Sequence, residues 1–89
     1  MPKAEIGWKR VTTDGVTLQV YARQVGGEWR FFWRTRRYEP WQPVAKPPLE
    51  DWLALLDALQ RMIPRRRFQP ADEQHLRRRI REHFPDAGA

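Results

Sequence analysis

Within residues 6–38, the segment 16–25 alternates between apolar and polar side chains, with the period of two that is typical of half-buried strands. Residues 28–38 are rich in aromatic side chains, which favour strands. Two dipeptides, Asp14-Gly15 and Gly26-Gly27, divide the region and are strong hairpin signals. The pattern therefore predicts a three-stranded antiparallel meander over about residues 6–13, 16–25 and 28–38.

Beyond residue 48 the apolar period changes to that of helices. Residues 49–63 carry a broad apolar face, preceded by Pro48 and begun by Glu50 and Asp51, which complement the dipole of a helix. That face consists of Leu49, Trp52, Leu53, Leu55, Leu56, Leu59, Met62 and Ile63. Residues 70–84 carry a narrower stripe of Leu76, Ile80 and Phe84, spaced by four. Two helices are therefore predicted, about 49–63 and 70–84.

These elements predict an α+β fold in one small domain spanning residues 1–89. We expect the first helix to pack on one face of the sheet and the second to dock at its side. Residues 39–48 contain four prolines and are expected to form a stiff connector. Trp41 lies within it, and we favour its plugging an edge of the core over its forming an exposed contact. Residues 86–89 are expected to fray.

The two faces of the sheet can be separated by assuming two-residue hairpin loops, which set the register. Around Gly26-Gly27 this places Val20 opposite Trp33, Ala22 opposite Phe31 and Gln24 opposite Trp29, on the side of the core. Tyr21 then faces Phe32, Arg23 faces Arg30 and Gln19 faces Arg34 on the other side. Around Asp14-Gly15 it places Trp8 opposite Tyr21 and Arg10 opposite Gln19. A slip or bulge of one residue would instead move Trp8 to the core.

The chain is basic, with a formal net charge of +6, and arginine provides 14 of its 17 cations. A positive excess favours polyanionic partners, with nucleic acid ahead of an anionic membrane. A coding bias toward GC-rich codons is an alternative explanation for arginine over lysine, although it does not explain the net charge.

Few residues suit catalysis or metal binding. The chain has no serine and no cysteine, and His75 and His83 are eight positions apart, unlike the i,i+4 pairs of helical zinc sites. The glycine pair precedes a predicted strand and not a helix, so it is no phosphate loop. We therefore expect neither an enzyme, a cofactor nor a metal site. The first residues show no apolar signal segment, and no apolar run is long enough to cross a bilayer, so a cytoplasmic location is expected.

The side of the sheet with arginines and aromatic rings is the most informative feature. Proteins that hold single strands stack bases on rings while cations follow the phosphates. On this hypothesis Arg23, Arg30, Arg34 and Arg36 bind phosphates, and Tyr21, Phe32 and Trp8 stack bases. A second basic set, Arg65, Arg66, Arg67, Arg77, Arg78 and Arg81, would extend the track of single-stranded DNA or RNA.

Other interpretations remain open. The second helix could cover Tyr21 and Phe32, or arginine stems could lie over the rings of an idle surface. The arginines of residues 65–81 fit a solvated helix face better than a phosphate clamp. A function of a different class is a protein-interaction or homodimerisation module, in which a partner covers the rings and the arginines form a rim.

In the order of its elements, the first two thirds of the chain is similar to small DNA-binding domains that read a groove with a three-stranded sheet, such as integrase arm-binding and plant AP2-type domains. The order also resembles single-strand-binding transcriptional coactivators. The resemblance covers architecture only and assigns no role to any residue.

Overall fold

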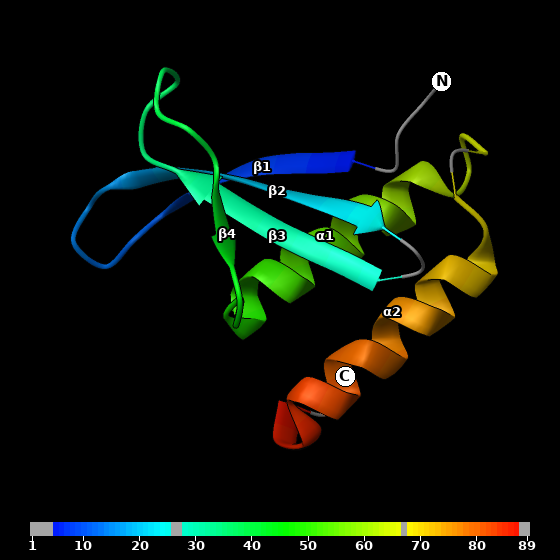
Figure 1. Cartoon of the computed structure of the whole chain (residues 1–89). Coiled ribbons are helices and arrows are strands. Elements are labelled where there is room, and N and C mark those ends of the chain that lie inside the picture. Colours follow the sequence, from blue (N-terminus) through cyan, green and yellow to red (C-terminus); the bar gives the residue numbers. More distant parts are fainter. Residues whose placement is uncertain (1–4, 26–27, 67, 88–89) are drawn as a thin grey trace. The chain divides into compact units, whose positions relative to one another are not determined.

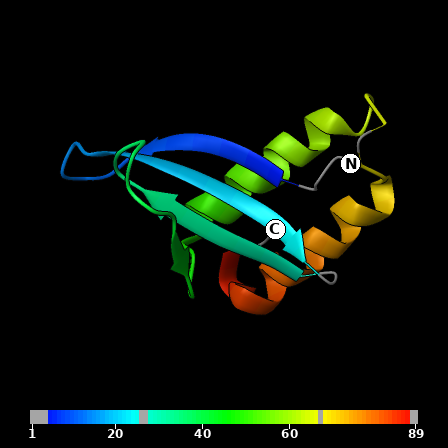
Figure 2. The ribbon, with the colours of Figure 1, turned by 45° about the horizontal axis from the view of Figure 1, so that its top comes forward.

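The computed structural model describes residues 5–25, 28–66 and 68–87 and divides into two compact units, residues 1–47 and 48–89. The first unit contains the antiparallel strands β1 (Glu5–Val11), β2 (Thr17–Val25), β3 (Glu28–Arg34) and β4 (Gln42–Val44). They form one sheet in the order β1-β2-β3-β4 (Figures 1 and 2). The second unit contains the helices α1 (Leu49–Met62) and α2 (Pro70–His83) and a short 3-10 helix, Pro85–Ala87. The predicted α+β meander is confirmed.

The predicted pairing of β2 with β3 is correct. Tyr21 lies opposite Phe32, Arg23 opposite Arg30 and Ala22 opposite Phe31, as two-residue loop geometry requires. The glycine pair 26–27 itself lies outside the described residues.

The predicted pairing of β1 with β2 is wrong by one residue. Trp8 lies opposite Val20, and Arg10 lies opposite Leu18. The reason is the turn: the Thr12 N–H donates to the Val16 carbonyl at 2.8 Å, which leaves a loop of three residues ending in Gly15 at φ +83°. A left-handed glycine that closes a three-residue loop is a common hairpin geometry, and it shifts every partner in β1 by one position.

The sheet has two chemically distinct faces. We name as the buried face the one that carries Ile6, Leu18, Val20, Ala22, Trp29 and Phe31, all of them buried. Trp8 and Arg10 share this face because of the observed register. We name as the outer face the opposite one, which carries Gln19, Tyr21, Arg23, Arg30, Phe32 and Arg34. These six side chains are half-buried, except that of Arg30, which is exposed.

The region after β3 also differs from the prediction. β3 ends at Arg34 and not near residue 38, and the proline-rich connector contains the short strand β4. In β4 Pro43 lies opposite Phe32. Proline lacks the N–H that a central strand must donate, but it is tolerated on an edge strand, and β4 is at the edge of the sheet.

The helical unit is held by the predicted apolar residues, with two corrections. Trp52, Leu55, Leu56 and Leu59 of α1 and Leu76 and Ile80 of α2 are buried. Leu53, which was predicted to lie on the apolar face, is 42% exposed, and Asp51, which was predicted only to complement the helix dipole, is 1% exposed. Residues two positions apart lie on nearly opposite sides of a helix. The observed buried face of α1 is therefore rotated from the predicted one, away from Leu53 and toward Asp51.

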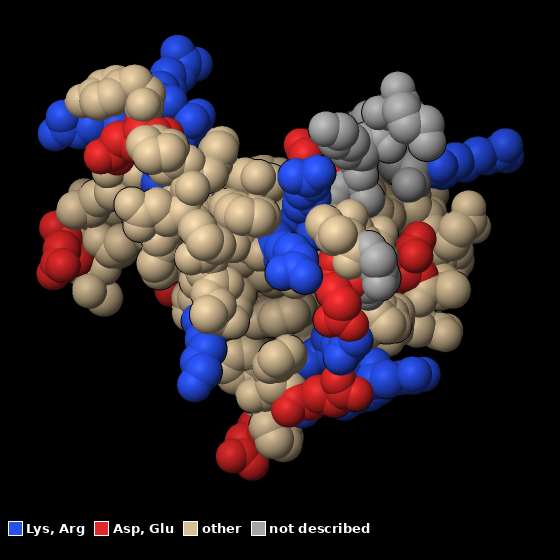
Figure 3. All heavy atoms as spheres, viewed as in Figure 1, with Lys and Arg blue, Asp and Glu red and all other residues tan. Residues whose placement is uncertain are grey.

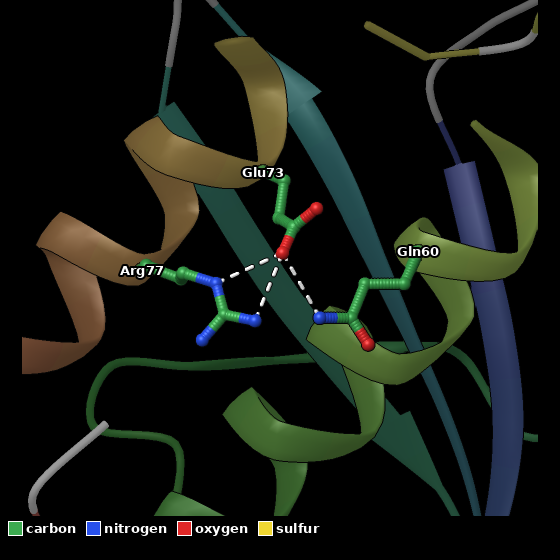
Figure 4. A network of polar contacts seen from close by, with 3 residues as sticks. All are labelled: Gln60, Glu73 and Arg77. Carbon is green, nitrogen blue, oxygen red and sulfur yellow. Dashed lines mark hydrogen bonds and ion pairs between the residues drawn. The ribbon is translucent and has the colours of Figure 1, made fainter. Parts of the chain in front are cut away.

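Polar contacts join and cap the helices. Asp72 accepts a hydrogen bond from the Gln69 N–H at 2.8 Å, which caps the start of α2. Glu73 Oε2 accepts from Gln60 Nε2 of α1 at 3.0 Å and from Arg77 Nε at 2.9 Å (Figure 4). These donors, that of Gln60 first, lower the pKa of Glu73. Glu73 and Arg77 thus form an i,i+4 pair of the kind that stabilises a helix.

The packing of α1 on the sheet and the organisation of the chain as one domain stay predictions. No helix in the described ranges has both the length and the apolar content needed to cross a bilayer.

Candidate nucleic-acid interface

Three aromatic rings form a cluster on the outer face. Tyr21 of β2 and Phe32 of β3 stack with their centroids 4.8 Å apart and an angle of 16° between planes. Trp41, just before β4, meets Tyr21 at 4.6 Å and 79°, an edge-to-face contact. All three are half-buried. The prediction that Trp41 plugs a core edge is therefore wrong, because it lies against rings of the outer face.

Arg34 contacts this cluster and links it by hydrogen bonds to the rest of the sheet unit. Its guanidinium lies over Trp41, with Cζ 4.1 Å from the ring centroid. Its Nε donates to Gln19 Oε1 at 2.8 Å, and its Nη1 donates to the Glu39 carbonyl at 3.4 Å. Two of the five guanidinium N–H groups are thus engaged within the protein. Arg34 therefore holds Trp41 in position, and only the guanidinium N–H groups that make no bond within the protein are available to a phosphate.

Arg23 and Arg30 form the most cationic part of the outer face. They lie directly opposite each other on β2 and β3. Glu5 of β1 offsets part of this charge, with its Oε2 3.9 Å from Arg23 Nε. Like charges directly across two strands repel. A bound anion between the two guanidinium groups would therefore lower the energy of this face.

Arg36 lies in the turn between β3 and β4, and not on the sheet as predicted. It is exposed, and its Nη1 donates to the Tyr38 hydroxyl at 2.7 Å. The turn is closed by Glu39, whose carboxylate accepts from the Thr35 hydroxyl and from the Arg36 N–H. The Thr35 hydroxyl, as the strongest of these contacts, lowers the pKa of Glu39.

Trp8 does not join the outer face, which corrects its predicted role in base stacking. In the observed register it packs edge-on against Phe31 of the buried face, with the centroids 6.2 Å apart. Arg10 lies over Trp33 on the same face, at 5.7 Å from the ring centroid. The stacking candidates that remain on the outer face are Tyr21 and Phe32, together with Trp41, which the sequence interpretation missed.

The arginines of the helical unit differ in how far they are engaged. Arg77 is paired with Glu73 at 2.9 Å, and Arg79 with Glu82 at 3.3 Å. Arg78 and Arg81 on α2, and Arg65 and Arg66 in the preceding loop, are exposed. Arg66 has a φ of +60°, and Arg67 lies outside the described residues. Figure 3 shows blue and red side chains close together in the lower part of the view, where Figure 1 draws α2.

The excess charge is concentrated in the sheet unit. Residues 1–47 contain nine Lys and Arg against four Asp and Glu, whereas residues 48–89 contain eight against seven. Nearly all of the net charge of +6 therefore belongs to the unit that carries the aromatic cluster.

Comparison of the chain with protein-family models, curated proteins and solved structures finds no match. In the described part of the chain, no three His, Asp or Glu side chains gather as a metal ion would require.

Proposed function

We propose that this chain is a small, non-enzymatic nucleic-acid-binding module that holds single-stranded DNA or RNA on the outer face of its sheet. The observation that carries the proposal is the Arg23–Arg30 pair, set across two strands beside the half-exposed rings of Tyr21, Phe32 and Trp41. Cations beside aromatic rings are the combination that single-strand-binding proteins use. The absence of serine and cysteine nucleophiles supports a role in binding rather than in catalysis.

The residues divide into two roles under this proposal. Arg23 and Arg30 bind phosphates, and Arg36 adds a cation beyond the end of β3. Arg34 holds Trp41 in place, and the three rings provide an apolar surface for bases or sugars. The exposed cations of the helical unit, Arg65, Arg66, Arg78 and Arg81, are a separate candidate set for binding phosphates, while Arg77 is engaged by Glu73.

The test is a titration with labelled single-stranded and duplex oligonucleotides at two salt concentrations. We expect the single strand to bind more tightly, with an affinity that falls steeply with salt because counterions are released. A chain that binds neither oligonucleotide at low salt would refute the proposal.

A pair of double variants localises the site. Arg23→Glu with Arg30→Glu should greatly weaken binding and reduce the salt slope by at least about 1.4, the value for two lost phosphate contacts on a single strand. Lys46→Glu with Arg61→Glu makes the same change in net charge at two exposed positions that are not among the candidate site residues. This control should retain most of the affinity, and equal losses in both variants would argue against a defined site.

A second function is favoured by the geometry of the rings. Because Tyr21 and Phe32 stack on each other and Arg34 covers Trp41, the cluster is a preorganised apolar patch with an arginine rim. Such a patch suits a protein partner or a second copy of the chain. Sedimentation at high salt distinguishes the two functions, since a dimer held by rings persists where nucleic-acid binding is lost.

A further inference from the structure

The turn between β3 and β4, residues 35–39, is folded by polar contacts of its own. The Glu39 carboxylate accepts from the Thr35 hydroxyl and, at 3.0 Å, from the Arg36 N–H. The Glu39 N–H donates back to the Arg36 carbonyl at 3.0 Å. Arg34 adds a bond to the Glu39 carbonyl from the end of β3. The backbone of the turn is therefore held in one conformation by its own side chains.

This turn presents its tip to solvent. Arg36, Arg37 and Tyr38 are exposed, and Tyr38 is 77% exposed. The Arg36 guanidinium donates to the Tyr38 hydroxyl at 2.7 Å, which orients the ring beside the cation. Figure 1 shows the loop projecting from the end of the sheet, and Figure 3 shows blue side chains on this projection. An aromatic ring and two cations thus stand together on a preformed support.

The rings of the outer face are less suited to receive a base. Stacking requires an accessible ring face. Tyr21 and Phe32 already stack on each other, and the Arg34 guanidinium covers Trp41. Of the Phe, Trp and Tyr residues in the described ranges, Tyr38 is the only one that is exposed.

We infer that this turn is the base-stacking element of the module. Tyr38 stacks on one base of a single strand, and Arg36 and Arg37 bind the phosphates on either side. The inference rests on the proposed function and assigns the role of Arg37 and Tyr38 within it. Because the turn is already ordered, binding loses little of its conformational entropy, which favours affinity.

The experiment uses the full chain and a single-stranded oligodeoxynucleotide with one 2-aminopurine, whose fluorescence reports stacking. Tyr38→Ala should weaken binding roughly 5- to 100-fold, the range of one lost base stack, and remove most of the fluorescence change. Tyr38→Phe keeps the ring and should stay close to the parent in both readouts. Arg37→Gln should reduce the salt slope by about 0.7. Val11→Ala, another exposed apolar position, is the matched control and should change neither readout.

The outcomes separate this inference from the proposed function. If the parent chain binds and the Arg23/Arg30 double variant does not, but Tyr38→Ala binds and changes the fluorescence as the parent does, the turn is not the stacking element and the outer face remains the site. If the parent chain itself does not bind at low salt, both proposals are refuted. Circular dichroism establishes that Tyr38→Ala is folded, as expected for a side chain that is mostly exposed.

Discussion

In the described ranges of the chain, Gly15 and Arg66 have left-handed backbone conformations, and substitutions at these two positions are predicted to have opposite effects on stability. Gly15 has φ +83° and Arg66 has φ +60°. In this region a side chain collides with its own backbone, at a cost of roughly 1–2 kcal/mol, which glycine avoids. A Cβ at Gly15 would meet nothing within 4 Å, so Gly15→Ala tests the backbone effect alone.

Gly15→Ala should therefore destabilise the protein by about 1 kcal/mol, and Arg66→Gly should stabilise it by up to about 1 kcal/mol, after the greater freedom of glycine in the unfolded chain is subtracted. Urea denaturation monitored by tryptophan fluorescence measures both. A loss of stability in Arg66→Gly would show that the Arg66 side chain makes stabilising contacts that outweigh its strain.

Glu73 predicts a dependence of stability on pH. Its hydrogen bonds to Gln60 and Arg77 lower the pKa of the Glu73 carboxyl in the folded protein below the ordinary value of 4.5. A carboxylate with a lowered pKa stabilises the fold above its ordinary pKa, and this contribution is lost as the pH falls through the lowered value. Stability should thus decline below about pH 4.5, and Glu73→Gln should make that decline shallower.

Urea midpoints between neutral and acidic pH measure this effect. Glu82→Gln removes one negative charge from an exposed ion pair on the same helix and serves as the control. If both variants flatten the pH dependence equally, the network of Gln60, Glu73 and Arg77 is not its source.

At the scale of elements, the number of residues in a turn decided which strand pairings could be predicted. The pattern around Gly26-Gly27 predicted the pairing of β2 with β3 correctly, including Tyr21 with Phe32. Around Asp14-Gly15 the same reasoning failed, because that dipeptide also ends three-residue loops with the glycine left-handed. Alternation cannot separate the two cases for β1, since Trp8 and Arg10 fit either face chemically.

β4 and the role of Trp41 could not be predicted for a different reason. Prolines argue against a central strand, but they say nothing against a short edge strand. The neighbours of Trp41 are Tyr21 of β2 and Arg34 of β3. Only the fold brings them together, so the aromatic cluster was predicted in part.

The contacts of Trp41 predict how much the aromatic cluster contributes to the stability of the fold. Trp41→Ala removes the edge-to-face contact with Tyr21 and the ring beneath Arg34, and it should cost about 1–3 kcal/mol, less than a fully buried tryptophan. Tyr38→Ala, at a position 77% exposed, should change stability by less than about 0.5 kcal/mol. Chemical denaturation compares the two, and an equal small effect would show that Trp41 adds little to the fold.

The corrected face of α1 gives a prediction of its own. Leu59 is fully buried and Leu53 is 42% exposed, although both were predicted to lie on one apolar face. Leu59→Ala should cost about 2–5 kcal/mol, because it leaves a cavity, and Leu53→Ala less than about 1 kcal/mol. Thermal unfolding measures both losses of stability. Similar losses would show that Leu53 and Leu59 lie on one buried face, as predicted from the sequence.

At the scale of the molecule, the division of charge between the units predicts which cations set the salt dependence of nucleic-acid binding. The sheet unit holds nine cations against four carboxylates, and the helical unit nearly balances its charges. On α2, Arg77 is also paired with Glu73 and Arg79 with Glu82, so the charge of these two arginines is partly offset. Counterion release should therefore come chiefly from the sheet unit.

This division predicts unequal effects for two variants that each remove two arginines. Arg23→Gln with Arg30→Gln should reduce the slope of log affinity against log salt by about 1.4, and Arg78→Gln with Arg81→Gln should reduce it by less than about 0.7. Both remove two exposed or half-exposed cations, so their effect on net charge is the same. Titrating one single-stranded oligonucleotide at several salt concentrations gives both slopes. A larger reduction for the helical pair would move the site to α2, because only cations that replace condensed counterions at phosphates change the slope.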